Sequence, residues 1–197
     1  MKKLIITFLL LISLLCMANA QVTKIGGGLT YGSGFHFNNE TGLEADLLRS
    51  PFAGIFLTGI YELSLPVHIS PSFTYFIPRT NNLNMAGYNA LSTRVSSMMF
   101  DFNGHYVFNS LDRFEFYGLA GLNITFTKIK WLGTLPSTGT DNAMGLNIGA
   151  GTYMKITEQF DLYGEVKYII SKYDQLMINA GILINVDWLK KHENSDL

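Results

Sequence analysis

The sequence predicts an all-β protein: an eight-stranded, antiparallel, up-and-down transmembrane β-barrel preceded by a cleaved signal peptide. Three observations lead to this prediction. Apolar and polar residues alternate with period two in eight runs, the connections between the runs alternate in length, and the polar face of the runs holds few charges. Charged residues make up 15% of the chain, against roughly 25% in ordinary soluble domains.

The first twenty residues have the three parts of a secretory signal peptide. Two lysines precede an apolar run that ends at Cys16, and residues 18–20 (Ala-Asn-Ala) form a small-x-small cleavage site. The apolar run is shorter than the roughly 18 to 20 residues that a spanning helix needs, so a retained anchor is the weaker hypothesis. Leu15 is bulkier than the residue that usually precedes a lipidated cysteine, which argues against a lipoprotein. We therefore expect residues 1–20 to be removed.

Cleavage leaves 12 basic residues (14 less 2) against 15 acidic residues, a net charge of −3 that does not favour nucleic acid as a partner. The remaining chain has no cysteine, which excludes disulfides, thiolate metal sites and cysteine nucleophiles. No linker or charge block divides it. We expect one barrel domain over residues 21–189 and a polar tail over residues 190–197.

The eight alternating runs lie near residues 22–37, 52–63, 66–77, 93–108, 113–127, 143–156, 160–171 and 175–188. The last run is the clearest, because Ile178, Ile182 and Ile184 share one face while Asn179 and Asn185 share the other. The second run is ambiguous, since it has apolar residues on both faces.

The connections between the runs are short and long in turn. Short links at residues 64–66, 109–112 and 157–159 interleave with longer ones at residues 38–51, 78–92 and 128–142. This alternation is typical of a membrane barrel with tight periplasmic turns and longer outer loops. The link at residues 172–174 departs from the trend, because it is short where an outer loop is expected.

Alternation alone does not distinguish a membrane barrel, apolar on its outside, from a soluble lipocalin-like barrel, apolar on its inside. The polar face consists mostly of Gly, Ser, Thr and Asn, whereas a soluble exterior is rich in Lys and Glu. We therefore expect the polar face to line the lumen. Two aromatic belts are expected at the membrane interfaces, formed by Tyr61, Tyr106, Phe108, Phe114, Phe160 and Trp188 at the turn side and by Tyr31, Tyr75, Phe126 and Tyr168 at the loop side.

Eight strands enclose an interior that side chains just fill, so a wide water-filled pore is not expected. The few charges of the polar face should pair with one another inside. The predicted lumen network consists of Asp101, His105, Glu115, Lys155, Glu165 and Lys167.

With these features the chain resembles the small eight-stranded outer-membrane barrels of Bacteroidota, those described as outer membrane protein β-barrel domain or PorT-like, with an OmpA/OmpX-like architecture. The resemblance covers residues 22–188 and includes the glycine-rich segments at residues 25–31 and 118–123. It implies an outer-membrane location, contact with outer-membrane lipid, and delivery by periplasmic chaperones and the barrel assembly machinery. Many such barrels end on an aromatic residue, whereas here Trp188 is followed by a tail.

Few patterns point to chemistry. His68-Ile69-Ser70 places a histidine and a serine on one strand face, as in some outer-membrane lipid A deacylases. Both side chains are expected in the lumen near a periplasmic turn, where an outer-leaflet acyl chain cannot reach. The four histidines show no metal-ligand spacing. We therefore expect no enzyme, no cofactor and no metal site.

Three functional hypotheses remain. The first is a structural or interaction barrel whose outer loops meet a partner that the sequence does not name. The second is a narrow channel for small or apolar solutes, suggested by the glycines of the lumen and the apolar second run. The third is a soluble, lipocalin-like ligand-binding barrel with its apolar face inside.

Overall fold

The computed structural model describes residues 21–34, 50–64, 66–83, 91–132 and 137–186. The predicted signal peptide (residues 1–20), the polar tail (residues 190–197), Trp188 and nearly all of the predicted loop at residues 38–51 lie outside these ranges. Among the residues described, no helix has the length and apolar character needed to cross a membrane.

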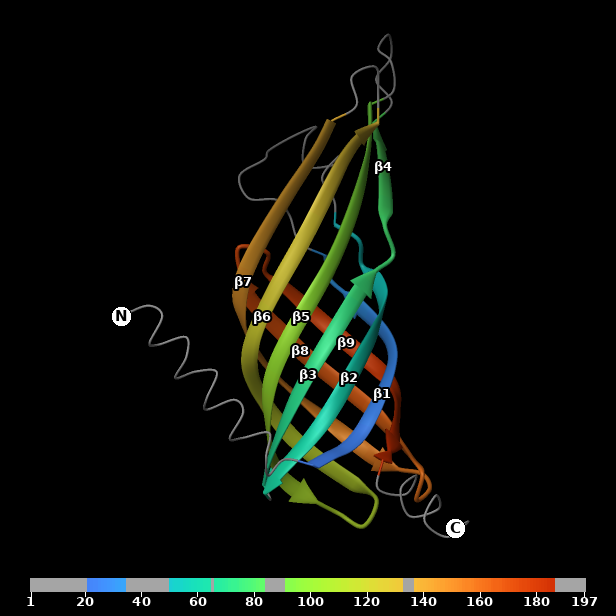
Figure 1. The fold of residues 1–197 in the computed structure, drawn as a ribbon, viewed down its shortest axis with the longest axis vertical. Coiled ribbons are helices and arrows are strands. Elements are labelled where there is room, and N and C mark those ends of the chain that lie inside the picture. Colours follow the sequence, from blue (N-terminus) through green and yellow to red (C-terminus); the bar gives the residue numbers. More distant parts are fainter. Residues whose placement is uncertain (1–20, 35–49, 65, 84–90, 133–136, 187–197) are drawn as a thin grey trace, which may run out of the picture.

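Antiparallel strands form one continuous wall that winds around a central axis (Figure 1). In the described part of the chain these are β1 (Gln21–Gly32), β2 (Ala53–Ser64), β3 (Val67–Phe76), β4 (Arg79–Leu83), β5 (Leu91–Ser110), β6 (Phe114–Leu132), β7 (Ser137–Lys155), β8 (Phe160–Ser171) and β9 (Gln175–Asn185).

The wall closes into a ring of eight positions, because β3 and β4 are two parts of one wall strand. Both pair with β5, first through Tyr75 opposite Met98 and then through Arg79 opposite Val95. Pro78 lies in the gap between them, and proline has no N–H with which to continue a ladder. β1 pairs with β2 on one side and with β9 on the other, which completes the ring. The predicted closed, eight-stranded antiparallel barrel is confirmed.

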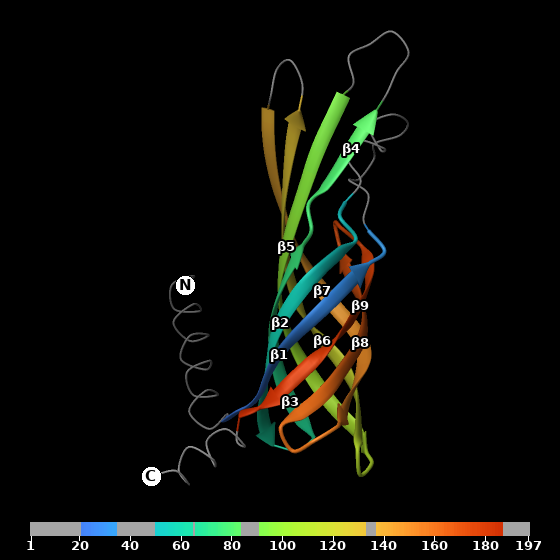
Figure 2. The same cartoon turned by 90° about the vertical axis from the view of Figure 1, so that its right-hand side faces the viewer.

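Three wall strands extend well beyond the ring at one end. β5, β6 and β7 have 20, 19 and 19 residues, whereas a tilted strand crosses a bilayer with roughly 9 to 11. Together with β4 they form a sheet that stands above the barrel (Figure 2). We refer to this end as the hairpin end, and to the opposite end, with its short links, as the turn end.

The prediction of long loops at residues 78–92 and 128–142 is therefore wrong in large part. β4 and the start of β5 occupy much of the first range, and only residues 133–136 separate β6 from β7. The physical reason is that a strand beyond the membrane has no lipid-facing side. Segments such as residues 137–142 then lack the apolar and polar contrast that identifies a strand, although their backbones pair.

The apolar face of each strand points outward. Leu29 is 69% exposed, Met144 73% and Ile148 58%, while polar side chains such as Asn123 and Asn147 on the opposite face are buried. A soluble ligand-binding barrel requires the reverse arrangement, so the structure contradicts that hypothesis.

Of the ten aromatic residues predicted to form two belts, Tyr61 and Phe114 are half-buried and Trp188 lies outside the described residues. The other seven are exposed near the two ends of the apolar band. They are Tyr106, Phe108 and Phe160 toward the turn end, and Tyr31, Tyr75, Phe126 and Tyr168 toward the hairpin end.

Candidate functional site in the barrel lumen

The lumen is filled by three layers of side chains. An apolar cluster near the turn end consists of Phe56, Ile60, Val107, Tyr117, Leu119, Tyr153, Tyr163 and Leu183. A second apolar cluster toward the hairpin end consists of Phe76, Met99, Ala143, Ile169, Tyr173 and Met177. Buried polar and charged side chains lie between them.

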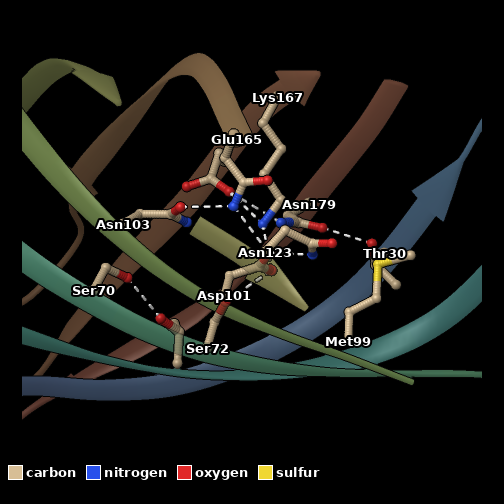
Figure 3. Close-up of polar contacts among 12 residues, drawn as sticks. Thr30, Ser70, Ser72, Met99, Asp101, Asn103, Asn123, Glu165, Lys167 and Asn179 are labelled. Atoms are coloured by element: carbon tan, nitrogen blue, oxygen red, sulfur yellow. Dashed lines mark hydrogen bonds and ion pairs between the residues drawn. The ribbon is translucent and has the colours of Figure 1, made fainter. Parts of the chain in front are cut away.

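The middle layer contains a buried ion pair between β5 and β8. The Lys167 ammonium lies 2.8 Å from an Asp101 carboxylate oxygen and 3.5 Å from Glu165 Oε1. The other Asp101 oxygen accepts hydrogen bonds from the side-chain amides of Asn123, at 2.7 Å, and Asn147, at 2.9 Å. These groups come from four strands, and Figure 3 shows Asp101, Asn123 and Lys167 pointing toward one another. The negative charge of Asp101 is thus matched by one cation and by further donors.

Glu165 is the second anionic centre. Tyr163 and Tyr117 donate hydrogen bonds from their hydroxyls to Glu165 Oε2, at 2.5 and 3.2 Å. Asn179 donates from its amide to Glu165 Oε1 at 3.1 Å and in turn accepts a hydrogen bond from the Thr30 hydroxyl at 2.6 Å. β1, β6, β8 and β9 are therefore tied together through one carboxylate.

His105 lies at the edge of this network. Its Nδ1 is 2.5 Å from the Tyr153 hydroxyl, and its ring stacks on Tyr117 with 4.2 Å between the ring centroids. Its Nε2 is 3.8 Å from Glu165, beyond hydrogen-bond distance. The imidazole is therefore held by a hydrogen bond to Tyr153 and by stacking on Tyr117.

The structure thus brings four of the six predicted lumen residues together, namely Asp101, His105, Glu165 and Lys167. Glu115 and Lys155 lie instead at the turn end, where they line a cavity of about 470 Å³. Lys155 is exposed, and Glu115 Oε2 is buried without a hydrogen-bond partner among the described residues.

Several contacts that the lumen depends on were not predicted from the sequence. Lys24 and Asp161 form a 2.8 Å ion pair at the turn end, although they are far apart in the chain. Tyr117, Tyr153 and Tyr163 were not identified as interior residues, although each stands at an inward position of its alternating run. That parity is the signal that could have found them.

The lumen glycines do not form an open path. A Cβ added to Gly151 would lie 2.3 Å from the Tyr117 hydroxyl oxygen, and one added to Gly149 would lie 2.9 Å from the Lys167 Cβ. At Gly151 glycine therefore makes room for the Tyr117 side chain, and at Gly149 it makes room for β8, whose nearest atom is the Val166 carbonyl oxygen at 2.2 Å. The second run has apolar residues on both faces because Phe56 and Ile60 point into the lumen, where they are 2% and 0% exposed.

Among the described residues, no hydrogen bond joins His68 to Ser70. Both are 1% exposed inside the barrel. The Ser70 hydroxyl shares a 2.9 Å hydrogen bond with Thr58, and neither ring nitrogen of His68 has a partner among the described residues. In the same part of the chain, no group of three or more His, Cys, Asp or Glu residues could hold a metal ion.

The model of a family described as outer membrane protein β-barrel domain matches residues 6–188. No curated protein matches the chain.

Three of the solved structures that share the fold illustrate the similarity. One is Ail, the attachment invasion locus protein of Yersinia pestis, in complex with the heparin analogue sucrose octasulfate; it is 15% identical, with 83% of this chain and 99% of that chain covered and a TM-score of 0.53. The N-terminal β-barrel domain of Pseudomonas aeruginosa OprF is 16% identical, with 84% and 98% covered and a TM-score of 0.53. A major outer membrane protein from Thermus thermophilus is 11% identical, with 82% and 98% covered and a TM-score of 0.54.

At these identities the solved structures support the fold alone. The family match extends over almost the whole chain and includes every strand of the barrel. The outward apolar face, the closed ring and the filled interior are what a small barrel in lipid requires. This chain belongs to the outer membrane protein β-barrel domain family.

Proposed function

We propose that this outer-membrane barrel is non-conducting and acts through its hairpin end, which stands outside the cell as a surface for interaction. The observation that carries the proposal is the contrast between the two parts of the molecule. The lumen is packed with side chains, whereas β4 to β7 extend beyond the ring as a sheet without a counterpart at the turn end (Figure 2).

Closure of the lumen follows from its layers. A solute would have to displace the apolar clusters at both levels and break the contacts of Lys167 with Asp101 and Glu165. Separating buried charges from their partners costs several kcal/mol, roughly 3–5 for one pair. The structure therefore favours a structural or interaction role over the narrow channel.

The orientation rests on the lengths of the connections. The turn end is closed by links such as residues 111–113 and 156–159, while the long strands all extend from the other end. Short turns on the periplasmic side and long extensions outside are the general pattern of such barrels.

We further propose that the chain belongs with the PorT-like barrels of Bacteroidota and is exported by the signal peptide at residues 1–20. Periplasmic chaperones and the barrel assembly machinery would then deliver it to outer-membrane lipid. The resemblance described above supports these assignments. It also favours a role without catalysis, and the hydrogen bond of Ser70 to Thr58 agrees with that.

Cysteine labelling on intact cells tests the orientation. The predicted mature chain has no cysteine of its own, so single cysteines can be placed at two exposed sites, Thr138 in the hairpin sheet and Asp112 in a turn. We expect a membrane-impermeant maleimide to label Thr138→Cys on intact cells and Asp112→Cys only after lysis. Labelling of Asp112→Cys on intact cells, with Thr138→Cys protected, would reverse the orientation and refute the proposal.

Conductance measurements test closure. Protein reconstituted in a planar bilayer should give no single-channel steps, and liposomes that contain it should take up small solutes no faster than empty ones. Insertion is verified on the same sample by a heat-dependent mobility shift on SDS gels. Discrete conductance from inserted protein would favour the channel hypothesis.

A further inference from the structure

The outward face of β5 and β6 changes from apolar to basic within one step along the strands. Met98 on β5 lies opposite Phe126 on β6, and both are exposed at the upper edge of the apolar band. The next outward row toward the hairpin end places Ser96 opposite Lys128, and the row beyond it places Arg94 opposite Lys130. We call Arg94, Lys128 and Lys130 the basic cluster.

The basic cluster has no anionic partner among the residues that the structure describes. All three side chains are exposed, and Arg94 and Lys130 face each other directly across the β5–β6 ladder. Like charges in directly opposed positions destabilise a sheet. The carboxylate that β7 carries, that of Asp141, already accepts hydrogen bonds from Lys172 and Tyr173. An external anion would offset the repulsion within the cluster.

A depression of about 470 Å³ lies beside the cluster on the same face. Tyr75, Met98 and Phe126 supply its apolar side. Its polar side is lined by Ser96, Lys128, Thr140 and Asn142, and by Asp141, whose carboxylate is engaged by Lys172 and Tyr173. The depression therefore runs from the apolar band, where acyl chains lie, to the height of the basic cluster. Hydroxyl groups on the polar side suit the hydroxyls of a sugar.

We propose that this face binds a phosphorylated glycolipid of the outer leaflet, with its phosphates on Arg94, Lys128 and Lys130 and an acyl chain against Met98 and Phe126. Guanidinium groups match phosphate through paired hydrogen bonds, and ammonium groups bind it as point charges. Charge complementarity selects an anionic ligand, and the adjoining apolar surface selects a lipid. The assignment to the outer leaflet rests on the proposed function, which places the hairpin end outside the cell.

Binding of lipid A to the full mature barrel in neutral nanodiscs tests the proposal. Each cation near a phosphate layer contributes to the binding free energy. The triple variant R94Q/K128Q/K130Q should therefore bind diphosphoryl lipid A about tenfold to a hundredfold more weakly. Lipid A stripped of its phosphates should bind the unaltered protein as weakly as diphosphoryl lipid A binds the triple variant. The matched control, K155Q, removes an exposed charge at the turn end and should leave binding unchanged.

Two results would overturn the inference. The first is lipid A binding by the triple variant equal to that of the unaltered protein, with a normal heat-dependent mobility shift in both. The second is soluble sucrose octasulfate or inorganic phosphate binding as tightly as lipid A, which would assign the cluster to a soluble anion. Nanodiscs expose both ends of the barrel, so these results are independent of the cysteine labelling that tests orientation.

Discussion

Replacement of Lys167 by methionine should destabilise the barrel severely, because it leaves two buried carboxylates without their shared cation. The Lys167 side chain is 1% exposed, and those of Asp101 and Glu165 are 0% and 1% exposed. Methionine keeps much of the volume of lysine and removes its charge. The substitution therefore isolates electrostatics from packing.

The magnitude follows from the two separations. With an effective dielectric constant near 20, attractions over 2.8 Å and 3.5 Å amount to about 6 and 5 kcal/mol. Releasing the lysine from burial returns several kcal/mol of this. Hydrogen bonds donated by Asn123 and Asn147 continue to stabilise Asp101. A net loss of roughly 3–5 kcal/mol is expected, as for other buried pairs that lose one partner.

Urea unfolding of the barrel in lipid vesicles, followed by tryptophan fluorescence and by loss of the compact band on gels, measures the loss. At a slope of about 1–3 kcal/mol per molar urea, the midpoint should fall by roughly 1–5 M. The control K155M removes an exposed lysine and should change stability by no more than about 0.5 kcal/mol. In a cycle with D101N, the double variant should lose less stability than the sum of the single variants. A K167M variant within about 1 kcal/mol of the unaltered protein would refute the reasoning.

Two further predictions concern packing and pH. Gly151→Ala places a methyl group 2.3 Å from the hydroxyl oxygen of an inward tyrosine. In the same assay it should lower the free energy of unfolding by about 1–3 kcal/mol. The control is Gly118→Ala, which should unfold as the unaltered protein does, because nothing lies within 4 Å of the added Cβ. Hydrogen bonds from Lys172 and Tyr173, above the membrane, hold the pKa of Asp141 below its ordinary value of 3.8. These contacts therefore stabilise the fold at pH values above the pKa that Asp141 has in the unfolded chain. The stabilisation is lost as the pH falls through the lower pKa that Asp141 has in the folded protein. A carbon-13 NMR titration of the Asp141 carboxyl should give a midpoint below 3.8, and a midpoint at or above that value would contradict the contacts.

The barrel itself could be predicted from the sequence because lipid imposes a strict pattern on each strand. Ile178 and Ile182 face outward and Asn179 faces inward, as the alternation indicates. The extended hairpins escaped prediction for the same reason. Beyond Met144 neither face of β7 meets lipid, so the alternation fades while the backbone pairing continues.

The candidate site could be predicted only in part, because alternation tells which side chains enter the lumen and not which ones meet. Lys167 and Asp101 are 66 positions apart in sequence, and their pairing depends on the stagger between their strands. Lys155 occupies an inward position of the alternating pattern, as the network residues do, yet it lies at the open turn end and is exposed. Height along the barrel axis, which decides the contacts, is set by register and not by local pattern.

Fractionation of expressing cells, followed by SDS gels of each fraction with and without boiling, tests the central claim most directly. A closed barrel in lipid should appear in the outer-membrane fraction as a compact band whose mobility changes on heating. A soluble periplasmic product with the same mobility in both lanes would contradict the outward apolar face and the membrane barrel with it.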